Sequence, residues 1–158
     1  MTQATRILNS DHRLEVRQTV AATLPEVFAF FSDAGNLQRL TSPELDFSIV
    51  TPLPIKMHVG TLIEYRLKLY GMPFLWKTLI SRWEPPHCFV DEQLKGPYRL
   101  WVHTHRFTET DEGTEIHDHV RYRLPVWPLG ESALPLVKVQ LDKIFAYRRQ
   151  VIDDLFNS

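Results

Sequence analysis

The sequence predicts an α+β protein in which consecutive antiparallel strands are followed by one long helix. Between residues 47 and 124, segments with a two-residue hydrophobic period are separated by short turns rich in proline and glycine. Short turns between consecutive strands require antiparallel pairing. From Ser132 to Phe156 the hydrophobic residues instead recur at intervals of three and four, which is typical of an amphipathic helix.

The first forty residues predict one strand and two short helices. Residues 11–22 alternate between apolar and polar side chains, which indicates a strand. Leu24–Phe31 follows as a short helix, because Thr23 is a suitable N-cap and Pro25 suits the first turn. Leu37–Leu40 provides a second helical turn before the strands begin.

Six further strands are expected, which gives seven in all. They are Phe47–Thr51, Thr61–Tyr70, Phe74–Glu84, Cys88–Leu94, Tyr98–Thr108 and Thr114–Leu124. The apolar stripe of the long helix contains one cation, Arg148. Three placements are open for it: snorkelling to an edge, pairing with an aspartate of the sheet, or holding an acidic group of a ligand.

Composition narrows the class of protein. A hydrophobic content of 44% over 158 residues is typical of a single globular domain, expected to span 1–158 with a core at about residues 10–156. The net charge of −1 gives no field that would attract nucleic acid. No apolar run approaches the roughly 18 residues of a membrane span, so no stable membrane insertion and a cytoplasmic location are expected. A single cysteine, Cys88, excludes an intramolecular disulfide.

A row of polar side chains within an apolar strand face is the main functional signal. In the segment from Tyr98 to Thr108, alternation places two histidines on one face with two aromatic residues. The neighbouring segments each add an aspartate to the same apolar row. Buried polar groups of this kind are paired or functional. The row consists of Phe89, Asp91, Gln93, Trp101, His103, His105, Phe107, Ile116, Asp118, Val120 and Tyr122.

Strand register predicts how one of these histidines is paired. Matching Phe107 with Ile116 keeps apolar side chains on one face, whereas a slip of one residue would mix the two faces. This register places His105 opposite Asp118. Gly113 can supply the positive φ that the intervening turn needs.

The preceding turn predicts a second pair. A loop of a few residues around Gly96 places Asp91 opposite His103, so that two facing His–Asp pairs share one side of the sheet. The other face of the last hairpin is far more charged, and we expect its His117 and His119 to be exposed to solvent.

The order of elements resembles the SRPBCC superfamily, the START-related helix-grip proteins that include plant pollen allergens and polyketide cyclases. The opening motif Ala22-Thr-Leu-Pro-Glu-Val-Phe-Ala-Phe-Phe-Ser-Asp33, the run of strands and the closing helix carry this resemblance, over about residues 10 to 156. Residues 85–93, 96–97 and 101–107 are most similar to bacterial ligand-binding members. The resemblance implies a seven-stranded antiparallel sheet bent around the C-terminal helix, with a cavity between them. It implies no catalytic residue, because the superfamily has no universal catalytic motif.

Binding of a small hydrophobic or aromatic molecule with a polar end is the first functional hypothesis. A ligand pocket of this kind would have a volume of roughly 300 Å³ or more, apolar walls and a few converging polar groups. Trp127, which precedes the helix, is a candidate gate. The expected walls are Trp76, Ile80, Phe89, Trp101, Phe107, Val120 and Tyr122, and the expected polar groups are Asp91, Gln93, His103, His105, Asp118 and Arg148.

Three alternatives remain. The His–Asp pairs serve only to stabilise the sheet, or they serve a cofactor-independent enzyme of cyclase or dehydratase type. In the enzyme, His103 or His105 would act as acid and base, with Asp118 or Asp91 orienting the imidazole. The third alternative is a partner-binding module that uses a sheet edge or the Trp127 loop, and a homodimer is possible.

A metal site is a separate possibility. His103 and His105 with an aspartate are ligand types that bind zinc or non-haem iron. However, if each aspartate is hydrogen-bonded to a histidine, too few groups remain to contact the ion. No metal and no cofactor are therefore expected.

Overall fold

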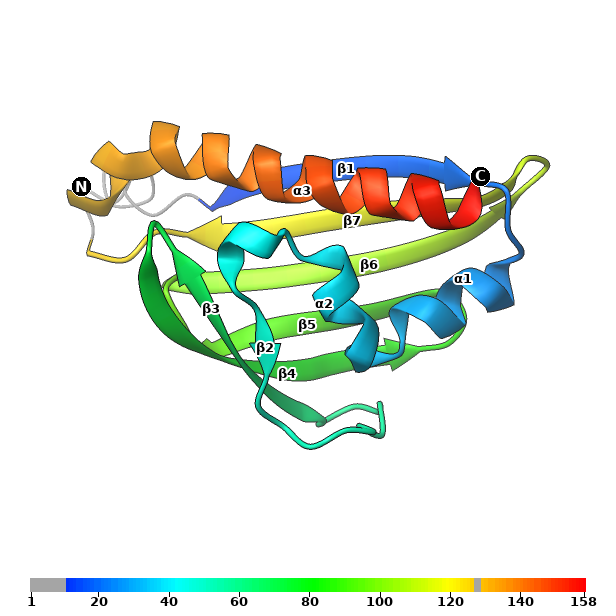
Figure 1. Ribbon diagram of the computed structural model, residues 1–158, viewed down its shortest axis with the longest axis horizontal. Coiled ribbons are helices and arrows are strands. Elements are labelled where there is room, and N and C mark those ends of the chain that lie inside the picture. The colour runs from blue at the N-terminus through cyan, green and yellow to red at the C-terminus, as the bar shows by residue number, and fades with distance from the viewer. Residues whose placement is uncertain (1–10, 127–128) are drawn as a thin grey trace, which may run out of the picture.

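The computed structural model describes residues 11–126 and 129–158, and within these ranges seven strands form one antiparallel sheet (Figure 1). The spatial order is β1-β7-β6-β5-β4-β3-β2, so each neighbouring pair except β1 and β7 is consecutive in sequence. The expected fold class is confirmed, although the second strand is shorter than predicted. The strands are β1 (His12–Val20), β2 (Ser48–Ile49), β3 (Leu62–Leu69), β4 (Met72–Glu84), β5 (Cys88–Lys95), β6 (Leu100–Thr110) and β7 (Gly113–Arg123).

The helices cover one side of the bent sheet (Figure 1). α1 (Leu24–Phe31) packs on β6 and β7, while α2 (Leu37–Leu40) packs on α3 (Leu134–Phe156), which also contacts β1. Short 3₁₀ turns link these elements: η2 (Ala34–Asn36), η3 (Pro43–Leu45) and η4 (Leu129–Ala133).

A capping box fixes the start of α1 as the sequence predicts. The backbone N–H of Thr23 donates to the carboxylate of Glu26 at 2.9 Å, and the Thr23 hydroxyl donates to the same oxygen at 2.7 Å. No described helix combines the length and the apolar composition that crossing a bilayer would need.

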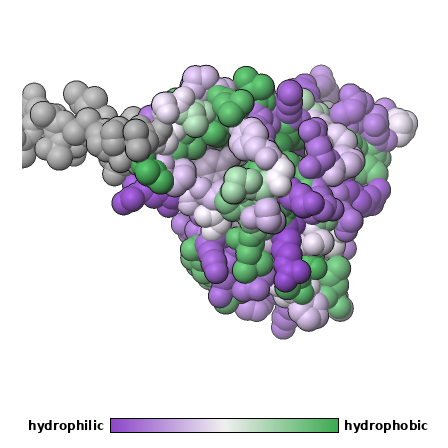
Figure 2. Space-filling model, turned by 60° about the vertical axis from the view of Figure 1, so that its left-hand side comes forward, coloured by the Kyte–Doolittle hydropathy of each residue, from purple (hydrophilic) through white to green (hydrophobic). Residues whose placement is uncertain are grey.

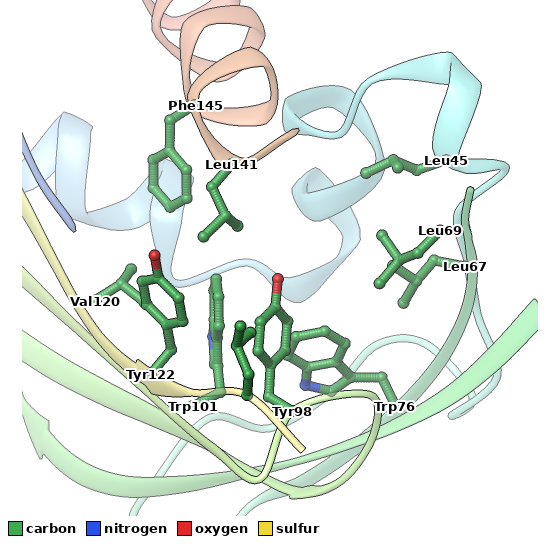
Figure 3. Packing of buried hydrophobic residues seen from close by; sticks show 11 residues of the cluster. Leu45, Leu67, Leu69, Trp76, Tyr98, Trp101, Val120, Tyr122, Leu141 and Phe145 are labelled. Carbon is green, nitrogen blue, oxygen red and sulfur yellow. The ribbon is translucent and has the colours of Figure 1, made fainter. Parts of the chain in front are cut away.

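The core consists of two hydrophobic clusters between the helices and the sheet. In the first, Leu141 and Phe145 point from α3 toward Trp101 and Tyr122, which stand on the sheet (Figure 3). The second joins α1 to the opposite end of the same strands, where the ring of Phe28 meets that of Phe107 edge-on at 5.6 Å. Ile152 of α3 belongs to this second cluster. The buried stripe of α3 is therefore the one that the periodicity predicts.

The predicted strand register is confirmed at the β5–β6 hairpin, where Asp91 lies opposite His103, and at the β6–β7 hairpin. Phe107 lies opposite Ile116, and His105 lies opposite Asp118. The turn is tighter than expected, because β6 continues to Thr110 and β7 begins at Gly113, whose φ is +131°. A Cβ atom at Gly113 would lie 2.0 Å from the carbonyl oxygen of Val20, so this position requires glycine on steric grounds as well.

The expectation that His117 and His119 are exposed is wrong, since both are half-buried. β1 pairs with β7 and places Arg17 and Glu15 opposite the two histidines. The Glu15 carboxylate lies 3.5 Å from Nε2 of His117. Long side chains of an adjacent strand thus cover a face that sequence alternation alone assigns to solvent.

Exposed apolar side chains are scattered over the surface, and on the face shown in Figure 2 hydrophobic residues lie among hydrophilic ones. Leu136 and Val139 of α3 are more than half exposed, as is Tyr70, whose hydroxyl donates to the Leu136 carbonyl oxygen at 3.2 Å. The homodimer and the partner-binding surface stay predictions.

Phe145→Ala tests whether α3 is held by burial of its apolar stripe. Phe145 is 6% exposed, and truncation of a buried Phe should lower the free energy of unfolding by about 3–5 kcal/mol. Urea denaturation measures this loss. Leu136→Ala, on the same helix at a position 57% exposed, should change it by less than about 0.5 kcal/mol. Similar small losses in both variants would contradict the packing described for α3.

Candidate ligand-binding site

A pocket of about 170 Å³ lies between α3, the segment from α1 to η3, and the sheet. Aromatic rings dominate its wall, and the edge of Trp76 meets the face of Trp101 at 5.4 Å with perpendicular planes. Tyr98 packs against Trp101 at 4.8 Å. Because these rings occupy much of the space under α3, the pocket is smaller than the roughly 300 Å³ expected.

Most of the residues expected at the site line this pocket. They are Trp76, Ile80, Phe89, Asp91, Trp101, His103, His105 and Arg148.

Five expected residues lie behind the lining instead. Gln93 braces the β5–β6 turn, because its side-chain amide donates to the Tyr98 carbonyl oxygen at 2.6 Å and accepts from the Tyr98 N–H at 3.1 Å. Phe107 packs on α1. Val120 and Tyr122 are at most 2% exposed in the first cluster, and Asp118 lies beneath the histidines. Trp127, the candidate gate, falls outside the described residues.

Sequence reasoning missed the wall that the α1–η3 segment contributes. Phe31, Ala34, Leu37 and Leu45 all line the pocket. The available signal was the apolar stripe of the predicted short helices, which has to be buried against some surface. Nothing in the periodicity says that this surface borders the same space as the polar row.

The two His–Asp pairs form across the diagonal and not between facing residues. Nε2 of His103 lies 2.8 Å from Oδ1 of Asp118, and Nε2 of His105 lies 2.5 Å from Oδ2 of Asp91. The backbone register is as predicted, and the facing pairs are in contact, with His105 3.4 Å from Asp118 and His103 3.9 Å from Asp91. The expectation that these facing pairs are the hydrogen-bonded ones is wrong. Diagonal neighbours on adjacent antiparallel strands are within reach of long side chains.

Ring stacking holds the two histidines in this arrangement. The imidazoles of His103 and His105 are stacked with centroids 3.7 Å apart. Phe89 stacks on the outer face of His105 at 4.1 Å, and Phe145 contacts His103 at 5.8 Å. The polar cluster formed by Asp91, His103, His105, Asp118 and Arg148 therefore lies between the two hydrophobic clusters.

Arg148 completes the polar cluster from the helix side. One of its terminal guanidinium nitrogens donates to Oδ1 of Asp118 at 3.3 Å, and the guanidinium lies 5.1 Å from the centre of the Phe31 ring. With 8% exposure it does not snorkel to an edge. Of the three placements open from the sequence, the ion pair with an aspartate is the one observed.

Both carboxylates of the cluster are held in the charged form. Burial acts to raise the pKa of Asp118, but the charge of Arg148, the bond to His103 and the nearby ring of His105 hold that pKa well below its ordinary value of 3.8. Burial is likewise outweighed at Asp91, where the bond to His105 and the charges of His103 and Arg148 lower the pKa. The Asp91 side chain keeps 18% exposure, and this residue faces the pocket.

The pKa values of the two histidines are shifted in opposite directions, although their surroundings are similar. Burial and the positive charge of His105 lower the pKa of His103, against the opposing effect of its bond to Asp118. Burial also acts to lower the pKa of His105, but two carboxylates outweigh it and raise that pKa. Asp91 lies 2.5 Å from Nε2 of His105, and Asp118 lies 3.4 Å from its Nδ1. The cluster thus shifts the pKa values of two stacked imidazoles in opposite directions.

Two groups in the pocket wall are chemically capable: the metal-binding atoms of the polar cluster and the hydroxyl of Tyr98. Asp91, His103 and His105 each offer one atom of a kind that can bind a metal ion, and these three atoms lie within 4.8 Å of one another. Farther along the wall, burial raises the pKa of Tyr98, so its hydroxyl stays protonated at neutral pH. That hydroxyl points toward α3 (Figure 3).

Comparison with solved structures identifies the fold. The aromatase/cyclase ZhuI from Streptomyces sp. R1128 aligns with a TM-score of 0.73 at 13% identity, over 90% of this chain and 92% of that chain. A protein from Thermus thermophilus aligns with a TM-score of 0.70 at 16% identity, over 92% and 95%. Major latex-like protein 151 from Panax ginseng aligns with a TM-score of 0.64 at 10% identity, over 92% and 97%.

These likenesses confirm the helix-grip fold that the resemblance to the SRPBCC superfamily implies. At such low identities they show the fold alone. No protein-family model matches the chain, and no curated protein matches it in sequence.

Asp118→Asn tests the electrostatics of the polar cluster. The stability that Asp118 contributes is complete above its unfolded pKa of about 3.9 and is lost as the pH falls through its lower folded pKa. The variant should therefore lose less stability than the wild type between neutral pH and acid. At pH 7 it should be less stable by about 3–5 kcal/mol, because Arg148 keeps a buried charge without its partner.

Denaturant unfolding across the pH range measures both effects. Asp111→Asn is the matched control, since Asp111 lies exposed in the β6–β7 turn. It should follow the wild type throughout. A pH dependence of Asp118→Asn identical to that of the wild type would show that this carboxylate is not held charged by the fold.

Proposed function

We propose that the protein binds a small hydrophobic or aromatic molecule with a polar end in the pocket between α3 and the sheet. The observation that carries this proposal is an aromatic-lined hollow that contains a partly exposed carboxylate, Asp91. Pockets that bind small molecules are mostly apolar, with a few placed polar groups. The fold is one that also occurs in an aromatase/cyclase and in a major latex-like protein.

The pocket volume supports a small ligand. An apolar cavity of about 150 Å³ is large enough to bind benzene, and this pocket measures about 170 Å³. A compound with one aromatic ring and a short substituent matches that volume. Trp76 and Trp101 meet edge to face, and a third ring can join such an arrangement by offset or edge contacts.

The polar groups in the wall indicate the chemistry of the polar end. The Asp91 carboxylate accepts hydrogen bonds only, whereas the protonated Tyr98 hydroxyl both donates and accepts. Arg148 already has its charge balanced by Asp118. These groups favour a ligand with a hydroxyl or amine donor over one with a free carboxylate.

A second candidate function is cofactor-independent acid–base catalysis of cyclase or dehydratase type. The observation that favours it is the opposite displacement of the pKa values of two histidines stacked 3.7 Å apart. Groups whose environments separate their pKa values are suited to act as base and acid. Neutral His103 would accept a proton from substrate carbon, and charged His105 would donate one to a leaving hydroxyl, which departs as water.

Ligand-observed NMR with one-ring phenols, anilines and benzoates tests the proposal. Phenols and anilines should bind more tightly than benzoates of equal size. Ala34→Leu should weaken binding, because Ala34 lines the pocket and the added carbons fill it. Ala29→Leu is the matched control, since Ala29 is exposed on α1, and it should bind as the wild type does.

Native mass spectrometry of the protein from cells complements this screen by showing which compound is retained. A bound compound recovered unchanged after incubation supports binding, and a dehydrated or cyclised product supports the second candidate. Equal binding by Ala34→Leu and the wild type would exclude this pocket as the site.

A further inference from the structure

Three potential metal ligands converge at the pocket wall from two adjacent strands. Asp91 comes from β5, and His103 and His105 come from one face of β6. Oδ2 of Asp91 lies 2.5 Å from Nε2 of His105 and 3.9 Å from Nδ1 of His103. All three residues line the pocket.

These separations are close to those of a metal site. With metal–ligand bonds of 2.0–2.2 Å, ligand atoms around a tetrahedral ion are about 3.3 Å apart. The observed distances of 2.5 and 3.9 Å lie on either side of this value. Small rotations of side chains on a rigid sheet are enough to equalise them, and the backbone need not move.

We propose that Asp91, His103 and His105 form a binding site for one divalent ion of zinc type, with its remaining coordination position facing the pocket. Two imidazoles and one carboxylate suit zinc and its first-row neighbours, whereas calcium and magnesium prefer oxygen ligands alone. Cys88, the sole cysteine, lies on the opposite face of β5 from Asp91's row and adds no thiolate.

Asp118 supplies the outer support that metal-bound histidines require. It accepts from Nε2 of His103 at 2.8 Å, which leaves Nδ1 of that ring with a lone pair toward the pocket. Its Oδ1 atom also lies 3.4 Å from Nδ1 of His105, a nitrogen that has no hydrogen-bond partner among the described residues. An ion on Nε2 of His105 would leave the proton on Nδ1, where Asp118 is the acceptor at hand.

Arg148 in turn fixes Asp118 from α3 at 3.3 Å. Carboxylates that accept from the outer nitrogen of a metal-bound histidine orient the ring and raise its basicity. Here one carboxylate faces the outer nitrogens of both histidines. Ion binding displaces the proton shared by His105 and Asp91, and that proton passes to solvent.

The diagonal pairing is the reason to revise the expectation of no metal. Facing His–Asp pairs would have used both aspartates as outer partners of the histidines. In the structure only Asp118 has that position, while Asp91 lies on the pocket side of both rings.

Metal titration of the chelator-treated full chain tests this proposal without any organic ligand. Calorimetry with Zn²⁺ should show one ion per chain, and Co²⁺ should give the intense visible absorption of a four- or five-coordinate nitrogen and oxygen site. Asp118→Asn should weaken Zn²⁺ binding by about 10- to 100-fold. Asp91→Asn and His103→Gln, which remove ligands, should weaken it further.

His117→Gln and His119→Gln are matched controls, because these histidines lie on the opposite face of β7. Both should retain wild-type affinity. Failure of the wild type to bind Zn²⁺ or to give the Co²⁺ spectrum would overturn the proposal, as would loss of binding in the controls. These two wild-type measurements decide the question even if the cluster variants do not fold. Ligand binding by the metal-free pocket is tested separately, so either proposal can fail alone.

Discussion

The negative charge of Asp118 is buried between the sheet and α3, where the residue is only 4% exposed to solvent. Removing a carboxylate from water costs several kcal/mol unless partners compensate for it. The structure supplies three partners: Arg148 from α3, and His103 and His105 from β6. Because Arg148 is the partner on the helix, this ion pair favours the position of α3 in which Arg148 faces Asp118 of β7. Sliding α3 along the sheet would separate the two charges, whereas its apolar contacts alone would tolerate a shift more readily.

The position of the polar cluster also shapes the pocket. One hydrophobic cluster contains Phe145 and Trp101, and the other contains Phe89 and Ile152. The charged groups lie between them and reach the pocket through Asp91 and the two histidines. The same charges shift the pKa values of the stacked imidazoles in opposite directions. The binding, catalytic and metal-ion proposals therefore all depend on one network of hydrogen bonds and charges.

Sequence periodicity predicted the elements and the register, because alternation and turn residues are local properties of the chain. Pairing Phe107 with Ile116 followed from keeping one face apolar. The partner of each histidine was not predictable in this way. A facing and a diagonal neighbour are both within reach of the ring, and alternation along the strand does not distinguish them. Ala34 and the other pocket residues of the α1–η3 segment were missed for a related reason, since their contacts are distant in sequence.

Nitrogen-15 NMR of the histidine rings, in metal-free protein at pH 6.5, reports directly whether the polar cluster shifts the pKa values of His103 and His105 in opposite directions, because 6.5 is the ordinary pKa of both. We expect a His105 that is mainly doubly protonated and a His103 that is mainly neutral, with its proton on Nε2, facing Asp118. Two histidines in the same protonation state, or a His103 proton on Nδ1, would contradict this expectation.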